Sequence, residues 1–160
     1  MEGTLEVMIV PTGGMPYRKT LEADEDGYFL AALQECVGGR IEPMGYVFDD
    51  EPCAYCDEEG LLPGSGCVPN RAIYADSAMV EAGYASQEDP SRAVREGELF
   101  HIAFGDLVCV GFNAETGEDR DISDAECARV MERFGTFESI VSGPLEACAV
   151  LARKGRTVRL

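Results

Sequence analysis

The chain has 160 residues and carries 30 acidic against 13 basic side chains, a formal net charge of −17 at pH 7. Charge of this sign repels the phosphates of nucleic acids and of anionic membranes, so we expect neither as a direct partner. With 46% apolar residues, the chain has the size and composition of one compact domain.

The first predicted elements are two strands and a helix. Apolar residues alternate over Leu5–Val10, the turn residues Pro11–Gly14 follow, and Tyr17–Leu21 returns as the partner of a hairpin. Helical spacing relates Phe29, Leu30, Leu33, Cys36 and Val37. We expect Asp24 or Asp26 to cap this helix and Gly38-Gly39 to end it, since glycine accepts the left-handed conformation.

The middle of the chain predicts a second pair of strands and two loops. Ile41–Phe48 reads as a strand, and Cys53–Cys56 pairs back on it after a turn. Pro and Gly recur through Leu61–Asn70, which predicts an ordered loop. Residues 76–97 are expected to leave the core as a long loop that contains a short helix.

The strongest strand signals come next. Phe100, Ile102 and Phe104 share one face of the strand Leu99–Phe104, and Gly105-Asp106 predicts a tight hairpin to the strand Leu107–Phe112. This second strand is apolar on both faces, which places it at the centre of the sheet.

Two helices are predicted after the strands. Ser123 and Glu126 have the spacing of a capping box, Cys127, Val130, Met131 and Phe134 form the expected buried stripe, and Gly135 ends the helix. A last helix is expected from Pro144 to Gly155. The sum is an α+β fold, with a mixed, mostly antiparallel sheet and two or three packed helices. We expect residues 1–135 to form one domain and 136–160 a helical extension packed on it.

Four segments occur in a recognisable order: Val37–Glu42, Asp57–Leu61, Val68–Ala72 and Gly105–Gly111. Over about residues 5 to 135 the chain resembles domain of unknown function 3846, a family of small proteins of bacteria, their phages and mobile elements. The resemblance implies a setting and no particular reaction.

The sequence lacks the features of an exported or membrane-spanning protein, and this bears on the state of its cysteines. The amino terminus lacks a basic region followed by an apolar one, and no uncharged apolar run approaches the ~20 residues that cross a bilayer. We therefore expect a cytoplasmic protein whose seven cysteines are reduced. A redox role for Cys53 and Cys56 is disfavoured, because neighbouring carboxylates raise a thiol's pKa.

A structural zinc site is the second alternative. Its ligands would be Cys53, Cys56, Cys67 and, as the fourth, His101 or Cys109. Only one Cys-x-x-Cys pair exists, and in a strand residues three apart point to opposite faces. We therefore expect no metal and no cofactor.

Catalysis is not indicated either. His101 is the only histidine, and no nucleophile-elbow spacing accompanies it. A structural histidine is the preferred interpretation, and we lean away from an enzyme.

Asn70 and Arg71 follow the Gly- and Pro-rich segment and suggest a small-ligand site near Val68–Arg71. An isolated arginine there could hold a carboxylate or phosphate through its bidentate fork. The preferred interpretation is structural: Arg71 neutralises Asp57, Glu58 or Glu59, or fixes the loop.

The acidic tracts carry the main functional hypothesis. Residues 1–128 hold 27 of the acidic side chains and only 7 of the basic ones. The candidate partner-binding residues are Asp49, Asp50, Glu51, Asp57, Glu58, Glu59, Glu115, Glu118, Asp119 and Asp121. A solvated surface is the default interpretation of such runs. Their extent favours a non-catalytic binding protein of mobile-element origin whose partner is a basic protein, for example one with a DNA-binding cleft. The sequence does not determine the oligomeric state.

Overall fold

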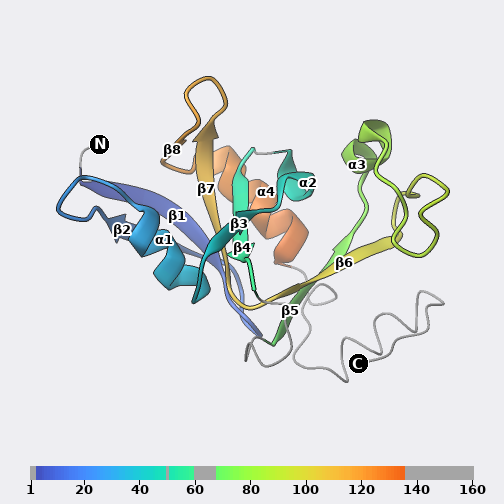
Figure 1. Ribbon diagram of the computed structural model, residues 1–160, viewed down its shortest axis with the longest axis horizontal. Helices are drawn as coiled ribbons and strands as arrows, with labels where there is room; N and C mark the ends of the chain where they lie inside the picture. Colours follow the sequence, from blue (N-terminus) through green and yellow to red (C-terminus); the bar gives the residue numbers. More distant parts are fainter. Residues whose placement is uncertain (1–2, 50, 60–67, 136–160) are drawn as a thin grey trace.

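The computed structural model describes residues 3–49, 51–59 and 68–135 (Figure 1). The strands in these residues are β1 (Thr4–Val10), β2 (Tyr17–Glu22), β3 (Ile41–Pro43), β4 (Cys53–Asp57), β5 (Pro69–Tyr74), β6 (Leu99–Phe104), β7 (Leu107–Asn113) and β8 (Glu118–Arg120). The helices are α1 (Leu30–Val37), α2 (Gly45–Phe48), α3 (Ser77–Ala82) and α4 (Asp124–Phe134).

The main sheet has the strand order β2-β1-β7-β4-β3, and the short β8 pairs with the end of β7. β5 and β6 form a separate two-stranded sheet. Neighbouring strands pair antiparallel in both sheets, and the predicted α+β class is confirmed. The central position predicted for the strand at 107–112 is also confirmed, because both faces of β7 are covered.

Side-chain alternation along β7 divides the core into two layers. Val108 and Val110 pack with Leu33 and Val37 of α1 on one face. Leu107 and Cys109 pack on the other face, where α4 contributes the buried side chains Cys127, Val130 and Phe134. The two longer helices thus cover opposite faces of one sheet, which fixes the face to which every residue of its strands points (Figure 1).

The caps of the helices agree only partly with expectation. Ser123 and Glu126 form the predicted capping box at the start of α4, but Met131 of the expected buried stripe is 37% exposed. Gly38 ends α1 in the left-handed conformation, as predicted. The predicted cap by Asp24 or Asp26 was wrong: Phe29 occupies the N-cap position, and Asp24 instead accepts hydrogen bonds from the backbone of the preceding turn.

The predicted hairpin of the strands at 99–104 and 107–112 was wrong. Gly105 does adopt a positive φ, but β6 pairs with β5 and β7 pairs with β1 and β4. Asn70 accounts for the separation, since its side-chain amide donates to the carbonyls of both Val10 and Gly105 at 2.8 Å. The chain therefore passes from one sheet to the other at this glycine.

In the middle of the chain, the secondary-structure elements are shorter and more varied than predicted. The expected strand 41–48 ends at Pro43 and continues as α2, with Met44 and Val47 buried. Asn70 lies within β5 and not in a loop. The expected short helix within 76–97 is α3, capped by Asp76.

The remaining expectations for chain organisation fall partly outside the structure. Residues 61–67 of the loop predicted at 61–70, and the predicted helical extension at 136–160, lie outside the described residues. No helix among the described residues has both the length and the apolar character needed to span a membrane.

Candidate functional site

Two acidic segments that are far apart in the sequence meet at one end of the main sheet. Cys53, the first residue of β4, pairs antiparallel with Val110 of β7, so the loop before β4 and the turn after β7 lie at the same end of the sheet. The loop before β4 carries Asp49 and Glu51, and the turn after β7 carries Glu115 and, at the start of β8, Glu118; all four side chains are exposed. We call these four residues the acidic end. Asp50, which sequence reasoning included here, lies outside the described residues.

Glu51 of the acidic end lies close enough to Arg120 of β8 to influence its charge. The pKa of Arg120 is raised, chiefly by its hydrogen bond with Glu126 and to a lesser extent by the charge of Glu51 on the neighbouring loop. Arg129 of α4 donates a hydrogen bond to the backbone carbonyl of Glu51, which holds that loop against the helix. The loop that carries Glu51 is therefore held against α4.

The third predicted acidic segment lies elsewhere. Asp57 ends β4 and pairs with Ile41, so Asp57–Glu59 occupies the opposite end of that strand. Asp57 accepts a hydrogen bond from the backbone N–H of Glu59, while Glu58 and Glu59 are exposed. The sequence grouped this segment with 49–51, and the sheet separates them.

Several acidic groups near β8 already have partners within the fold. Asp121 accepts a 2.9 Å hydrogen bond from the backbone N–H of Glu6. Glu126 is buried and forms two hydrogen bonds with Arg120, which, with those from Ser123, hold its pKa below the usual range despite burial. Glu126 therefore stabilises the start of α4 and Asp121 is bonded to β1, so both are poorly placed to bind a partner.

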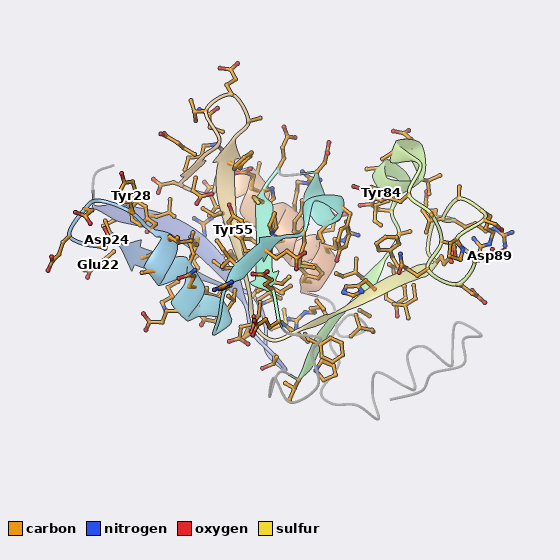
Figure 2. All side chains as sticks on the ribbon, in the orientation of Figure 1. Glu22, Asp24, Tyr28, Tyr55, Tyr84 and Asp89 are labelled. Carbon is orange, nitrogen blue, oxygen red and sulfur yellow. The ribbon has the colours of Figure 1, made fainter. Side chains whose placement is uncertain are left out.

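A groove of about 670 Å³ adjoins the acidic end on the face covered by α1. Residues on its walls include Asp24, Tyr28, Leu30, Ile41, Glu118 and Asp119. Three of its lining side chains are carboxylates and none is Lys or Arg. We call it the α1–β8 groove; Figure 2 labels Asp24 and Tyr28 beside α1, and Tyr55 on β4.

Asp119 is the only half-buried carboxylate among those of this groove, and it contacts Tyr55. The Tyr55 hydroxyl donates a 2.9 Å hydrogen bond to Asp119 Oδ1. Burial raises the pKa of Asp119, and the hydrogen bond from Tyr55 acts against that rise. The pKa of Tyr55 is itself raised, chiefly by burial, so its hydroxyl stays protonated and acts as the donor.

The period of the strand explains why no base reaches Asp119. Asp119 and Arg120 are neighbours in β8, so their side chains point to opposite faces. Arg120 lies on the α4 face with Glu126. Among the residues that the structure describes, no Lys or Arg forms an ion pair with Asp119.

Sequence reasoning named Glu118 and Asp119 but missed the other groove residues. Asp24 was assigned to a helix cap and Leu30 to the apolar face of that helix, and Tyr28 was not singled out. A usable signal was present: the acidic run 24–26 leads directly into Tyr28, Phe29 and Leu30, more bulky apolar residues than one buried stripe requires.

Asn70 and Arg71 are buried, and their polar groups bind the protein itself. Arg71 donates to the carbonyls of Pro11, Gly14 and Phe134 and to the Asn70 side-chain oxygen. None of these partners is the predicted carboxylate at 57–59. Burial lowers the pKa of Arg71 to about 10, which leaves it charged at neutral pH. Arg71 thus ties β5 to the β1–β2 turn and to the end of α4; the ligand pocket near Val68–Arg71 stays a prediction.

The structure distributes the candidate zinc ligands over both faces of the sheet. Cys53 belongs to the core under α1, whereas Cys56 packs against the core under α4. Cys56 and His101 do line one pocket of about 260 Å³ with Glu42 and Glu58. Cys67 lies outside the described residues. Within the described ranges, no three His, Cys, Asp or Glu side chains are grouped as a metal site requires.

The protonation states in that pocket argue against nucleophilic chemistry. The pKa of Cys56 is raised to about 11, first by burial and then by the charges of Glu42 and Asp57, so the thiol is protonated at neutral pH. Burial lowers the pKa of His101, and its ring contacts the ring of Tyr46 edge-on. Both groups are neutral at pH 7 in this setting.

Comparison with known families gives one match. The model of the family described as a domain of unknown function (DUF3846) matches residues 5–135. The chain belongs to this family. Neither the curated proteins nor the solved structures contain a match.

The DUF3846 match spans the elements that build the groove and the acidic end. It begins within β1 and ends at Gly135, directly after α4. The DUF3846 domain therefore includes both sheets, the helices that cover the main sheet and all of the acidic residues discussed above.

Proposed function

We propose that this protein is a non-catalytic binding protein, of mobile-element origin, for a basic macromolecular partner. The observation that carries the proposal is the meeting of Asp49 and Glu51 with Glu115 and Glu118 at one end of the sheet, next to a groove that has carboxylates and no base. A fold that needed only solubility could scatter these charges as well as gather them.

Electrostatics gives this proposal a specific behaviour. A concentrated negative surface steers a positively charged partner and speeds its association. Exposed charges are screened by salt over a Debye length of ~10 Å at 0.1 M, so binding through them weakens as the ionic strength rises. The partner is expected to be a protein with clustered Lys and Arg.

The proposal places this activity in the cytoplasm. Cys36, Cys56, Cys109 and Cys127 are free thiols, which is typical of a reducing compartment.

The test compares two charge-matched variants of the full chain in pull-downs from host lysate at low and high salt. Glu51→Gln with Glu115→Gln removes two charges from the acidic end; Glu58→Gln with Glu59→Gln removes two from the opposite end of β4. We expect the first variant to lose the salt-sensitive partner and the second to keep it. Unchanged capture and unchanged salt dependence in the first variant would contradict the proposal.

A further inference from the structure

The α1–β8 groove has an apolar side that a soluble fold does not require. Tyr28 is 68% exposed and Leu30 is 54% exposed, whereas Leu33 and Val37 of the same helix are buried. Single exposed apolar side chains are common, but adjacent ones beside a groove mark a contact surface more often. Phe29 and Ile41 extend this apolar side down to the core.

The charged side of the groove is negative. Asp24, Glu118 and Asp119 contribute three carboxylates. The amino terminus of α1 contributes a partial charge of the opposite sign, equivalent to roughly half a positive charge. Three full charges outweigh this fraction, so the groove favours a cation.

Asp119 occupies a position that is unfavourable for a carboxylate without a bound cation. It is half-buried, and the Tyr55 hydroxyl satisfies only one of its oxygens with a single hydrogen bond. A desolvated carboxylate is stabilised by a cationic neighbour, and the described part of the chain supplies none by ion pairing. An incoming guanidinium or ammonium group would supply it.

We propose that the α1–β8 groove binds a protein segment in which an arginine or lysine lies beside an apolar side chain. The cationic group contacts Asp119, and the apolar side chain packs on Tyr28 and Leu30. A groove of about 670 Å³ has the volume of a site for a short segment of this kind. This inference rests on the proposed function and names the part of the surface that gives it specificity.

The test uses a fluorescein-labelled peptide of three Arg-Leu repeats, with fluorescence anisotropy against the full-length protein. Two matched peptides replace Arg by citrulline, which keeps the shape without the charge, or Leu by Gly. We expect wild-type protein to bind the Arg-Leu peptide and each matched peptide to bind at least about tenfold more weakly, the order of one charge-assisted or apolar contact.

Variants of the protein locate the binding. Asp119→Asn keeps an acceptor for Tyr55 and is matched in charge by Glu59→Gln at the far end of β4. Tyr28→Ala is matched by Tyr17→Ala, whose side chain is 49% exposed on β2. We expect Asp119→Asn and Tyr28→Ala to weaken binding about tenfold and the two controls to change it less than twofold.

The outcomes separate this inference from the proposed function. Equal weakening by Asp119→Asn and Glu59→Gln would contradict binding in the groove and would support binding to the acidic surface in general. Equal binding of the citrulline peptide would overturn recognition of a cation. If the Arg-Leu peptide did not bind, the inference that the groove binds such a segment would be wrong. The proposed function would be unaffected, because the pull-down with the Glu51 and Glu115 substitutions tests it separately.

Discussion

The Tyr55 hydroxyl lies 2.9 Å from Asp119 Oδ1, although the two residues are 64 positions apart in the chain. β4 and β8 both pair with β7, and strand alternation turns both side chains toward the face covered by α1. In this position the carboxylate of Asp119 is half-buried, and burial raises its pKa. Tyr55 holds the Asp119 side chain in place at the wall of the groove.

Asp119→Asn is expected to raise the free energy of unfolding at pH 7. A carboxyl whose pKa is raised in the folded protein costs stability as the pH rises through that pKa, and below the unfolded value of about 3.9 both states are protonated. The gain should therefore disappear near pH 3. Urea unfolding followed by circular dichroism at the two pH values measures it.

A loss of stability in Asp119→Asn at pH 7 would show that the ionised carboxylate supports the fold. The expected result, higher stability with weaker peptide binding, is the pattern of a residue kept for function at a cost in stability. Glu59→Gln serves as the control, because its exposed side chain should change stability by less than about 0.5 kcal/mol.

Arg71→Ala should be among the most destabilising substitutions in the chain. The guanidinium is buried and hydrogen-bonded to the carbonyls of Pro11, Gly14 and Phe134. Each buried acceptor left unsatisfied costs about 1–3 kcal/mol, and we expect a total loss of about 3–5 kcal/mol in urea unfolding. Arg95→Ala, at an exposed position, is the control.

A stable Arg71→Ala protein would instead favour the ligand pocket predicted near Val68–Arg71. A loss within the range of surface substitutions, about 0.5 kcal/mol, would mean that the hydrogen bonds of Arg71 contribute little to the fold.

Glu98 is expected to hold the loop between α3 and β6 in a pH-dependent way. Its carboxylate accepts hydrogen bonds from Arg92, Ser86 and the backbone N–H of Arg95, and its pKa is lowered to about 2, chiefly by Arg92. This stabilisation is fully present above the unfolded value of about 4.3 and is lost as the pH falls toward 2.

Glu98→Gln should loosen that loop without unfolding the sheet. The backbone amide of Val94, bonded to Tyr84, reports on the loop, and its hydrogen exchange should become about tenfold faster. Glu88→Gln is the matched control, because its oxygen lies 3.9 Å from Arg92 on an exposed side chain. Equal exchange in the two variants would contradict the anchoring role of Glu98.

Gly111→Ala should disturb the approach of the segment after β8 to β7. A Cβ at this buried position would lie 2.5 Å from the backbone carbonyl oxygen of Asp121. Overpacking of this kind costs about 1–3 kcal/mol, since the backbone itself must move. Urea unfolding measures the change, and stability equal to wild type would show that the segment moves aside freely.

Local signals in the sequence were reliable where short-range physics decides the outcome. The capping box of Ser123 and Glu126 uses groups three residues apart, and Gly38 ends α1 through its own backbone freedom. The apolar character of β7 on both faces correctly placed it at the centre of the sheet. Strand periodicity also predicted that Cys53 and Cys56 would point to opposite faces.

Long-range pairing was the part that sequence could not supply. Gly105-Asp106 has the form of a hairpin turn, yet Asn70 bridges the carbonyls of Val10 and Gly105 and the two strands enter different sheets. The alternation of apolar and polar residues along a strand indicates which side chains share a face, but it does not determine which strand pairs with it.

The sequence by itself determined that this is an acidic α+β domain of one family, with β7 central and α4 capped, because composition and local hydrogen bonding decide those features. Only the tertiary structure decided which carboxylates lie together. Antiparallel pairing of β4 with β7 placed the segments of Glu51 and Glu115 at the same end of the sheet and Asp57–Glu59 at the other end. The opposite orientations of Asp119 and Arg120 then left one carboxylate facing the groove and gave its neighbouring base to Glu126.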